Sequence, residues 1–366
     1  MNPLVSILIP AYNMQEWIAE AIESALRQTW RRSEVVIVDD GSRDQTLHVS
    51  RRFASKAVCV ISQTNQGASA ARNAALAACQ GDYIQWLDAD DRLEPDKIEQ
   101  QVRRIGDGGS CRTLLSGAWA SFYYRTRTAR FSPTPLWSDL APVEWLFRKL
   151  GQNLYMQTAN WLVSRELTEA AGPWDTRLLS DDDGEYFCRV LLASDGVRFI
   201  PEAKSYYRRT TYFSSVSYIA GSNKKLEALF ISMMRQMNSL LSMEDSERTR
   251  SACIQYIRNW LHEFYPYRRD LGVRLIQIAS ELGGRHVKPR LQWRYHWIVK
   301  LFGWSLARRA QTLGARARLS AASRWDGALY HLEEQAGLPF LRPVVLPRVG
   351  SEQVPAREAG ADKPNA

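Results

Sequence analysis

Residues 35–46 read VVIVDDGSRDQT, and this stretch decides the expected fold class. Its four β-branched residues predict a short buried strand, and two aspartates, a glycine and a serine follow where that strand ends. The same order occurs twice more nearby. VSILI at 5–9 precedes AYN at 11–13, and YIQWL at 83–87 precedes DAD at 88–90. Strands that end in polar residues are typical of α/β proteins, which bind ligands beyond the carboxyl ends of their strands.

Stretches with helical periodicity separate these strands. Residues 13–26 carry apolar side chains at helical spacing, and Asn13 with Glu16 is expected to form a capping box. The Ala-rich residues 68–78 predict a second clear helix, and residues 57–62 predict a further strand. Alternation of strand and helix indicates a mainly parallel sheet with helices on both faces. The three polar segments are therefore expected to share one rim of the sheet.

The composition is that of an ordinary globular protein. The chain has 366 residues, of which 45% are hydrophobic and 24% charged. No apolar run is long enough to span a bilayer, and the N-terminus lacks the basic segment of a signal peptide. The five cysteines and the five histidines are widely scattered, so neither a disulfide framework nor a zinc site is expected.

The sequence has no glycine-rich phosphate-binding motif. Neither GxGxxG after the first strand nor GxxxxGK[ST] occurs, so the phosphates of a nucleotide would have to be neutralised in another way. Asp88 and Asp90 offer the hard oxygen ligands that Mg²⁺ or Mn²⁺ prefers. The alternative is that residues 88–91 form only a solvated turn and helix cap. Two further polar segments on the same rim favour the metal site.

Four segments occur in an order and placement typical of one known family. They are VSILIPAYN, VVIVDDGSRDQT, NQGASAARNAAL and GDYIQWLDADD, at residues 5–13, 35–46, 65–76 and 81–91. Together they resemble family 2 glycosyltransferases of the GT-A fold. Residues 172–193, GPWDTRLLSDDDGEYFCRVLLA, are similar to the later element of that family, an acidic pair followed by a helix that carries an arginine. The resemblance implies a Rossmann-like nucleotide-binding half in a mainly parallel, helix-flanked sheet.

The resemblance also implies which residues bind the nucleotide. Pro10, Ala11 and Tyr12 would pack around the base. Asp40 would accept a hydrogen bond from the N3–H group of the base, which favours uracil or thymine. Arg72 would lie near the base and the diphosphate.

The metal site is implied in the same way. Asp88 matches the first carboxylate of the family's D-x-D motif, near the ribose or the metal. Asp90 matches the second and would ligate Mn²⁺ or Mg²⁺. The ion would stabilise the leaving nucleoside diphosphate as a Lewis acid.

The general base of the family lies six positions before an arginine on the following helix. Counting back from Arg189 gives Asp183, and Asp182 lies beside it on the acceptor side, where the family more commonly has Glu. Asp183 would take the proton of an acceptor hydroxyl as that oxygen attacks the anomeric carbon opposite the diphosphate, which inverts its configuration. Taken without the family, residues 181–183 could instead be a negative cluster that caps a helix beginning near Gly184.

Tryptophans on the acceptor side are open to two interpretations. Residues 155–164 predict a strand there, and Trp161 or Trp174 could stack on the apolar face of a sugar. Either tryptophan could equally belong to the core.

The net charge of +9 is unevenly distributed along the chain. Residues 1–200 have a net charge of −3, whereas residues 201–350 have +13. Residues 285–324 hold ten Lys or Arg, no Asp or Glu, and several aromatic residues. Such a stretch could lie on an anionic membrane surface or simply be a solvated helical face, and nucleic acid is the least favoured partner.

The domain organisation follows from these differences. We expect a GT-A domain at 1–215, with a nucleotide-sugar half at 1–105 and an acceptor half at 106–215. A basic α-helical region is expected at 216–342, followed by a disordered tail at 343–366.

The combined prediction is a metal-dependent, inverting glycosyltransferase. It would move a sugar from a UDP or dTDP donor to a hydroxyl of a glycan or lipid-linked acceptor, in the synthesis of a surface polysaccharide or glycoconjugate. We expect it in the cytoplasm, peripheral on the inner face of the membrane. One alternative is a sugar-phosphate nucleotidyltransferase, which would normally carry a basic, Gly-rich loop after the first strand. The other is a non-enzymatic membrane-binding or nucleic-acid-binding protein, which only residues 285–324 support.

Overall fold

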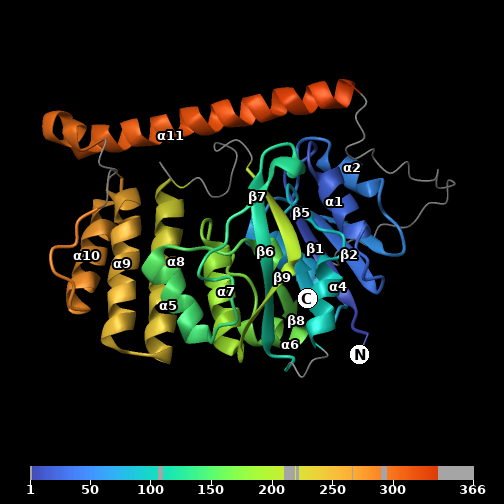
Figure 1. Ribbon diagram of the computed structural model, residues 1–366, viewed down its shortest axis with the longest axis horizontal. Coiled ribbons are helices and arrows are strands. Elements are labelled where there is room, and N and C mark those ends of the chain that lie inside the picture. Colours follow the sequence, from blue (N-terminus) through green and yellow to red (C-terminus); the bar gives the residue numbers. More distant parts are fainter. Residues whose placement is uncertain are drawn as a thin grey trace, which may run out of the picture.

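The computed structural model describes residues 2–105, 110–209, 219, 222–265, 267–289 and 295–336. Within them, one sheet of nine strands has the order β3-β2-β1-β4-β8-β6-β9-β5, with β7 beside β6. Helices cover both of its faces, and a layer of helices stands at one side (Figure 1). The chain therefore has the expected α/β class.

The N-terminal half is a parallel α/β unit. Its strands are β1 (Val5–Ala11), β2 (Ser33–Asp39), β3 (Val58–Ser62) and β4 (Tyr83–Trp86), with the short β5 at Arg92–Leu93. Its helices are α1 (Ile18–Leu26), α2 (Thr46–Arg51), α3 (Ala68–Ala78) and α4 (Lys97–Ile105). Strands β1 to β4 all run parallel. The predicted strands and the predicted helix at 68–78 are thereby confirmed.

Strand β1 shows why this sheet is buried on both sides. Its side chains alternate between the two faces, as the strand geometry requires. Ile7 and Ile9 pack into the cluster that includes α1, and Leu8 packs into the opposite cluster with α3. All three are fully buried, which explains the continuous apolar run in the sequence.

The predicted capping box at Asn13 and Glu16 is wrong, because α1 begins only at Ile18. Asn13 adopts a left-handed φ of 53°, and its side-chain oxygen accepts a hydrogen bond of 2.8 Å from the backbone N–H of Arg43. The N–H of Asn13 donates to Ser42 Oγ at 2.9 Å. Asn13 therefore joins the loop after β1 to the loop after β2.

The second half of the sheet is mixed. Its strands are β6 (Thr113–Phe122), β7 (Arg130–Phe131), β8 (Leu162–Ser164) and β9 (Gly196–Arg208), and its helices are α5 (Pro142–Gln152), α6 (Arg165–Ala171) and α7 (Asp182–Ala193). Strand β8 runs antiparallel to β4 and β6, whereas β6 and β9 are parallel. The predicted strand at 155–164 is wrong except for its last three residues, because Thr158–Asn160 form a 3₁₀ turn.

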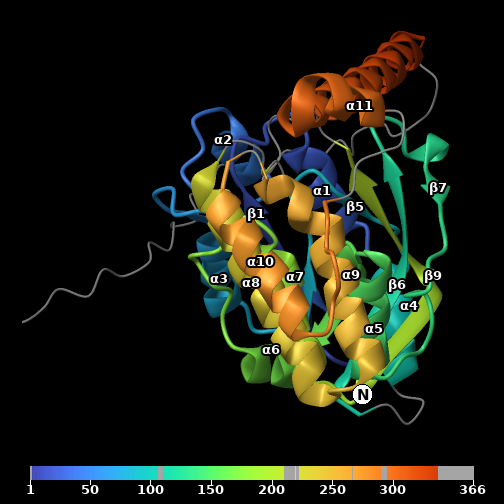
Figure 2. The ribbon, with the colours of Figure 1, turned by 90° about the vertical axis from the view of Figure 1, so that its left-hand side faces the viewer.

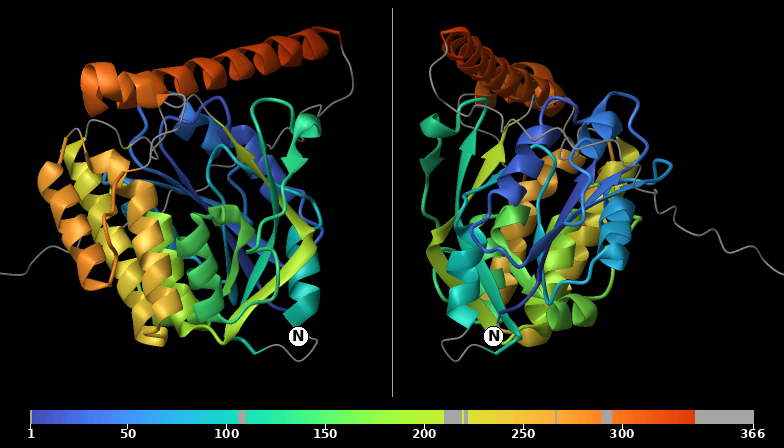
Figure 3. Two further views of the ribbon diagram at one scale, coloured as in Figure 1. Left: turned by 60° about the vertical axis from the view of Figure 1, so that its left-hand side comes forward. Right: turned by 90° about the vertical axis from the view of Figure 1, so that its right-hand side faces the viewer.

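The C-terminal region is helical, with α8 (Asn223–Met243), α9 (Glu247–Phe264), α10 (Arg269–Glu281) and α11 (His296–Gln335). Helices α8 to α10 stand beside α5 and α7, and Figure 2 shows α11 crossing above them. Figure 3 places α11 at the end of the molecule opposite the N-terminus. Strands β1 to β4 run toward that end, so α11 lies on the side of their carboxyl ends.

Two predicted boundaries lie outside the described residues. They are the domain boundary at 215 and the tail at 343–366. Among the helices that the structure describes, none combines the length and the apolar character needed to cross a membrane.

Candidate active site

A buried arginine joins the acidic segments after β4 and before α7. Arg72 on α3 donates to Asp88 Oδ1 at 3.0 Å and to Asp182 Oδ2 at 2.7 Å. Its guanidinium lies 4.4 Å above the ring of Trp174. Burial lowers the pKa of Arg72, but the charges of Asp182 and Asp88 outweigh that effect and leave its pKa raised. The structure thus brings together three residues that lie in three separate segments of the sequence.

Asp183 adjoins this cluster in the first turn of α7. Its only hydrogen bond among the described residues is from the N–H of Gly184 to its own Oδ1, at 2.8 Å. Burial, and then repulsion by Asp182 and Asp181, raise the pKa of Asp183 to about 7. A carboxylate with that pKa can accept a proton near neutral pH.

The turn after β4 concentrates carboxylates. Asp88 and Asp90 are half-buried, and Asp91 is fully buried. Burial and repulsion by Asp90 and Asp88 raise the pKa of Asp91 well above its usual value. Asp91 accepts hydrogen bonds from the backbone N–H of Arg208, at 2.8 Å, and from the side chain of Gln157. Asp91 therefore holds the turn in place, while its two neighbours remain partly open to solvent.

Arg208 is the important residue that sequence reasoning missed. It is fully buried at the end of β9, between the rings of Trp17 at 4.0 Å and Phe122 at 4.5 Å. Its Nε donates to the backbone oxygen of Asp90 at 2.9 Å, and its Nη2 donates to Glu20 at 2.7 Å. No local pattern marks Arg208, because its partners lie more than 80 residues away in sequence.

The residues of this turn fit a divalent cation. Within the described part of the chain, no group of three or more His, Cys, Asp or Glu side chains is arranged to hold a metal. Asp88 and Asp90 would thus supply two carboxylates, and phosphate and water oxygens would complete the shell, as is usual for Mg²⁺. The repulsion that these two carboxylates exert on Asp91 is the kind of charge excess that a divalent cation relieves.

Asp40 shapes the wall of the expected base pocket. Its carboxylate accepts hydrogen bonds from Gln63 Nε2 at 2.7 Å and from the backbone N–H groups of Gln66 at 2.9 Å and Gly67 at 2.8 Å. Its contact with a base stays a prediction. Asp39, for which the sequence predicted no separate role, has a buried oxygen without a hydrogen-bond partner among the described residues.

A cavity of about 630 Å³ opens beside these aspartates. It is lined by Tyr12, Gly41, Arg43, Ser62, Gln63, Thr64 and Asn65. Tyr12 is 40% exposed, whereas Ala11 is buried at the end of β1 and Pro10 is half-buried. Of the three predicted base-packing residues, Tyr12 alone lines this cavity.

The tryptophans predicted for the acceptor side lie in the core. Trp161 is fully buried and stacks on Phe187, with 5.3 Å between ring centroids. Trp174 is also buried and stacks on Tyr186 at 4.0 Å. The structure therefore favours the core-packing interpretation of both. Trp174 also contacts the acidic cluster through Arg72, as does Asp182.

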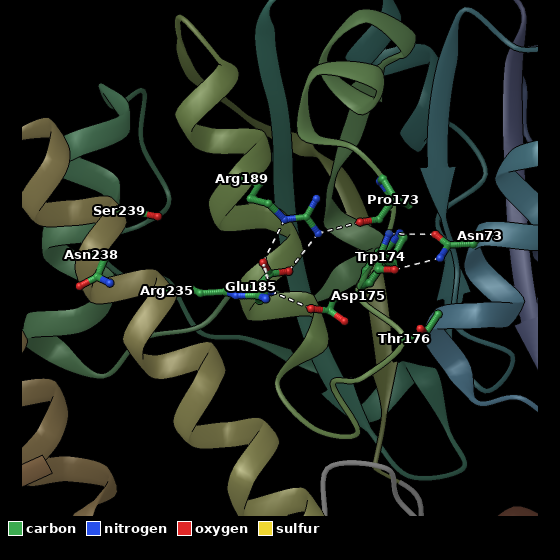
Figure 4. A pocket seen from close by; sticks show the side chains of 10 residues that line it. All are labelled: Asn73, Pro173, Trp174, Asp175, Thr176, Glu185, Arg189, Arg235, Asn238 and Ser239. Carbon is green, nitrogen blue, oxygen red and sulfur yellow. Dashed lines mark hydrogen bonds and ion pairs between the residues drawn. The ribbon is translucent and has the colours of Figure 1, made fainter. Parts of the chain in front are cut away.

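Ion pairs between α7 and α8 surround a second cavity, of about 740 Å³ (Figure 4). Arg235 on α8 bridges Asp175 and Glu185, both at 2.9 Å. Arg189 donates to Glu185 and to the backbone oxygen of Pro173, each at 2.9 Å. Arg189, from which the position of Asp183 was counted, thus braces the loop before α7.

Helix α11 contributes to a third cavity, of about 360 Å³, at the rim. Tyr12, Arg208 and Ser323 are among its lining residues. Asp326 on the same helix accepts a hydrogen bond of 2.9 Å from the backbone N–H of Tyr124, in the loop after β6. This contact fastens α11 to the side of the sheet that holds the acidic cluster.

Comparisons with known proteins agree with this geometry. Residues 6–170 match the family model described as glycosyl transferase family 2. An uncharacterized glycosyltransferase of Rickettsia prowazekii is 41% identical over 101 residues, which cover 28% of this chain and 31% of that protein. A chondroitin synthase of Escherichia coli is 50% identical over 99 residues, or 26% of this chain and 14% of that protein. The matched segment thus spans less than a third of the length of either relative.

Solved structures extend the likeness of fold over the C-terminal helices. The crystal structure of S. aureus TarS 1-349 has a TM-score of 0.55 and 19% sequence identity, and the match covers 92% of this chain and 93% of that one. A second TarS structure, in complex with UDP-GlcNAc, also has a TM-score of 0.55, at 19% identity, and covers 91% and 92%.

The sheet order, the rim of carboxylates and these likenesses define the class. The chain has a fold of the GT-A type. Residues 6–170, somewhat less than half of the chain, match the model of glycosyl transferase family 2.

Proposed function

We propose that this protein is an inverting glycosyltransferase in which Asp183 is the general base. The observation that carries the proposal is the placement of Asp183 beside the cluster of Arg72, Asp88 and Asp182. One side of the cluster comes from the nucleotide-binding half of the sheet and the other from α7. Donor and acceptor groups would therefore meet between the two.

The mechanism follows from what each side chain can do. Asp183 takes the proton from the acceptor hydroxyl, and that oxygen forms a bond to the anomeric carbon while the bond to the diphosphate breaks on the opposite face. Arg72 holds Asp182 and Asp88 at fixed distances and carries positive charge at the rim. Mn²⁺ or Mg²⁺ bound by Asp88 and Asp90 would supply Lewis-acid stabilisation of the departing diphosphate.

The donor that we propose is a UDP-sugar or a dTDP-sugar. Support comes from the cavity at Tyr12, whose lining residue Gln63 bonds to Asp40. Beside it, Asp39 has an oxygen without a hydrogen-bond partner among the described residues. Carboxylate oxygens can accept a hydrogen bond from the N3–H group of uracil or thymine. The UDP-GlcNAc in one TarS complex is a donor of this kind.

The acceptor that we propose is a glycan or a lipid-linked glycan at an anionic membrane surface, on the inner face of the membrane. Among the described residues, fourteen large apolar side chains are exposed, and seven of them lie on α11. They are Trp297, Leu301, Phe302, Leu306, Leu313, Trp325 and Leu332. Exposed arginines at 309, 318 and 324 accompany them, which is the composition of a helix that lies on an anionic surface.

Thermal denaturation with UDP or dTDP, each with and without Mn²⁺, tests the proposed donor site. We expect the melting temperature to rise with nucleotide and to rise further with the metal, because a ligand of the native state stabilises it. No rise with either nucleotide in the presence of Mn²⁺ would contradict the proposal.

A further inference from the structure

Behind Asp183, a buried polar network joins the C-terminal helices to the start of α7. We infer that Lys149 on α5, with Ser232 and Gln236 on α8, forms a positioning device for Asp183. This inference rests on the proposed function of Asp183. The residues involved are far apart in sequence, and Ser232 and Gln236 lie beyond the segment that matches the family model.

The network converges on Asp181, the residue that precedes α7. Asp181 has a left-handed φ of 53°. Its Oδ2 accepts hydrogen bonds from Ser232 Oγ and Gln236 Nε2, both at 2.7 Å. A left-handed conformation is unfavourable for a residue other than glycine and persists where surrounding contacts determine it. The two bonds from α8 are such contacts.

Lys149 completes the network from a second helix. It is 8% exposed, and its Nζ donates to Gln236 Oε1. Ser232 and Gln236 are fully buried. Placing a charged amine in such surroundings is costly unless it is paired. Its charge acts on the acids of the α7 start, because Lys149 lowers the pKa of both Asp181 and Asp183.

Glycine at position 184 makes room for this arrangement. A Cβ atom at Gly184 would lie 2.3 Å from Asp181 Oδ1, which is too close for any side chain. Arg235, which lies about one turn after Ser232 on α8, pairs with Glu185 at 2.9 Å (Figure 4). Helix α8 thus holds α7 through Asp181 and again through Glu185, on either side of Asp183.

Asp183 depends on this support, because the one hydrogen bond of its side chain among the described residues is accepted from the N–H of its neighbour Gly184. The position of its carboxylate is therefore set by the backbone of α7. Its protonation is set by the groups that face it. These are Asp181 and Asp182 on its own segment, Arg72 on α3, Lys149 on α5 and Tyr256 on α9.

Two variants separate the geometric effect from the effect of charge. Lys149→Met removes a cation, and we expect the acidic limb of the pH profile of kcat to move upward by about one unit, a tenfold loss on the acid side. Ser232→Ala removes the hydroxyl that donates to both the backbone oxygen and the Oδ2 of Asp181, at 3.0 and 2.7 Å, but it removes no charge. We expect it to lower kcat about fivefold to tenfold, the loss that corresponds to one hydrogen bond, without moving the limb. The donor KM should stay within about twofold in both.

Arg148→Met is the matched control, because Arg148 is the neighbouring cation on α5, and among the described residues it pairs with Glu144 and the backbone oxygen of Pro135, away from Asp181. It should leave kcat and its pH profile unchanged. A folded Lys149→Met protein with the wild-type pH profile overturns the inference. If that variant does not fold, wild-type kcat in Ser232→Ala overturns it. If the wild type transfers no sugar, the proposed function itself is overturned. If the wild type is active, the results for the variants bear on the inference alone.

Discussion

As the proposed general base, Asp183 has to be ionised for catalysis, yet its burial disfavours the charged form. Burial and the neighbouring carboxylates raise its pKa from 3.8 to about 7. The unfolded chain loses this proton near pH 4, whereas the folded chain keeps it until about pH 7. Stability therefore falls as the pH rises through this window and then levels off.

Asp183→Asn should raise the melting temperature at about pH 8, where wild-type Asp183 is charged, and change it little at about pH 4, where the wild type is protonated. Scanning calorimetry at the two pH values measures the difference. Asp195→Asn, at an exposed position, is the control. A lower melting temperature for Asp183→Asn at the higher pH would contradict the pKa assignment.

The rate of transfer should have its acidic limb near pH 7. Only the ionised form of Asp183 accepts the proton of the acceptor, so kcat should fall about tenfold per pH unit below that value. Steady-state rates across the range test this. A limb near pH 4 would indicate that the base is a carboxylate with an ordinary pKa.

Asp40 should matter to the fold as well as to any ligand. Asp40→Ala leaves the N–H groups of Gln66 and Gly67 without their acceptor, and we expect it to destabilise the protein by about 2 kcal/mol. Urea denaturation measures the loss. Asp39→Asn leaves the acceptor of these N–H groups, Asp40, in place, so it should lower UDP affinity more than stability. The reverse pattern would exchange the roles of the two aspartates.

At the scale of elements, local patterns predicted what local physics determines. The strands at 5–9, 35–38 and 83–87 were predictable because parallel strands are continuous apolar runs, and the helix at 68–78 because it is rich in alanine. The start of α1 was not, because Asn13 bonds to the β2 loop instead of capping a helix.

The residues of the candidate site likewise fall into those that local sequence predicts and those that it does not. The acidic residues could be found from their segments, since each follows a strand or precedes a helix. Arg208, Lys149 and Gln236 could not, because each acts through contacts that exist only after distant elements pack together. The burial of Trp161 is likewise decided by α5 and α7, which supply Trp145 and Phe187 as its neighbours.

Asp326 is one of the residues that fasten helix α11 to the sheet. This side chain accepts from the N–H of Tyr124 and pairs with Arg125, whose other partner is Glu333. Asp326→Ala should release the helix and increase trypsin cleavage at its exposed arginines several-fold, without lowering the main melting transition. Asp245→Ala, at the surface before α9, is the control. Equal cleavage in both variants would show that other contacts hold α11.

At the scale of the whole molecule, the uneven charge along the sequence corresponds to different places in the folded protein. The acidic half contains the candidate site, and α11 with its arginines lies across the end toward which the parallel strands run (Figure 3). An anionic surface bound by α11 would therefore face the side of the molecule that holds the acidic cluster.

Sedimentation with vesicles that contain anionic lipid tests this orientation. Changing Arg309, Arg318 and Arg324 to Glu should weaken binding strongly, since each basic residue near such a surface contributes about 1 kcal/mol. The matched control changes Arg31, Arg51 and Arg52, which are exposed on the α1–α2 side, and alters net charge equally. Equal weakening by both would mean that total charge, not α11, causes binding.

The proposed transfer of a sugar, with Asp183 as the general base, is tested by turnover of a nucleotide sugar by the full chain. UDP-sugars and dTDP-sugars are incubated with Mn²⁺ and a mixed glycan and lipid-linked acceptor fraction, and release of the nucleoside diphosphate is measured for the wild type and Asp183→Asn. We predict metal-dependent release by the wild type, and its loss in Asp183→Asn with nucleotide-induced thermal stabilisation retained. Full activity in Asp183→Asn would contradict the role of Asp183 as the base. No release from any donor by the wild type would contradict the proposed glycosyl transfer.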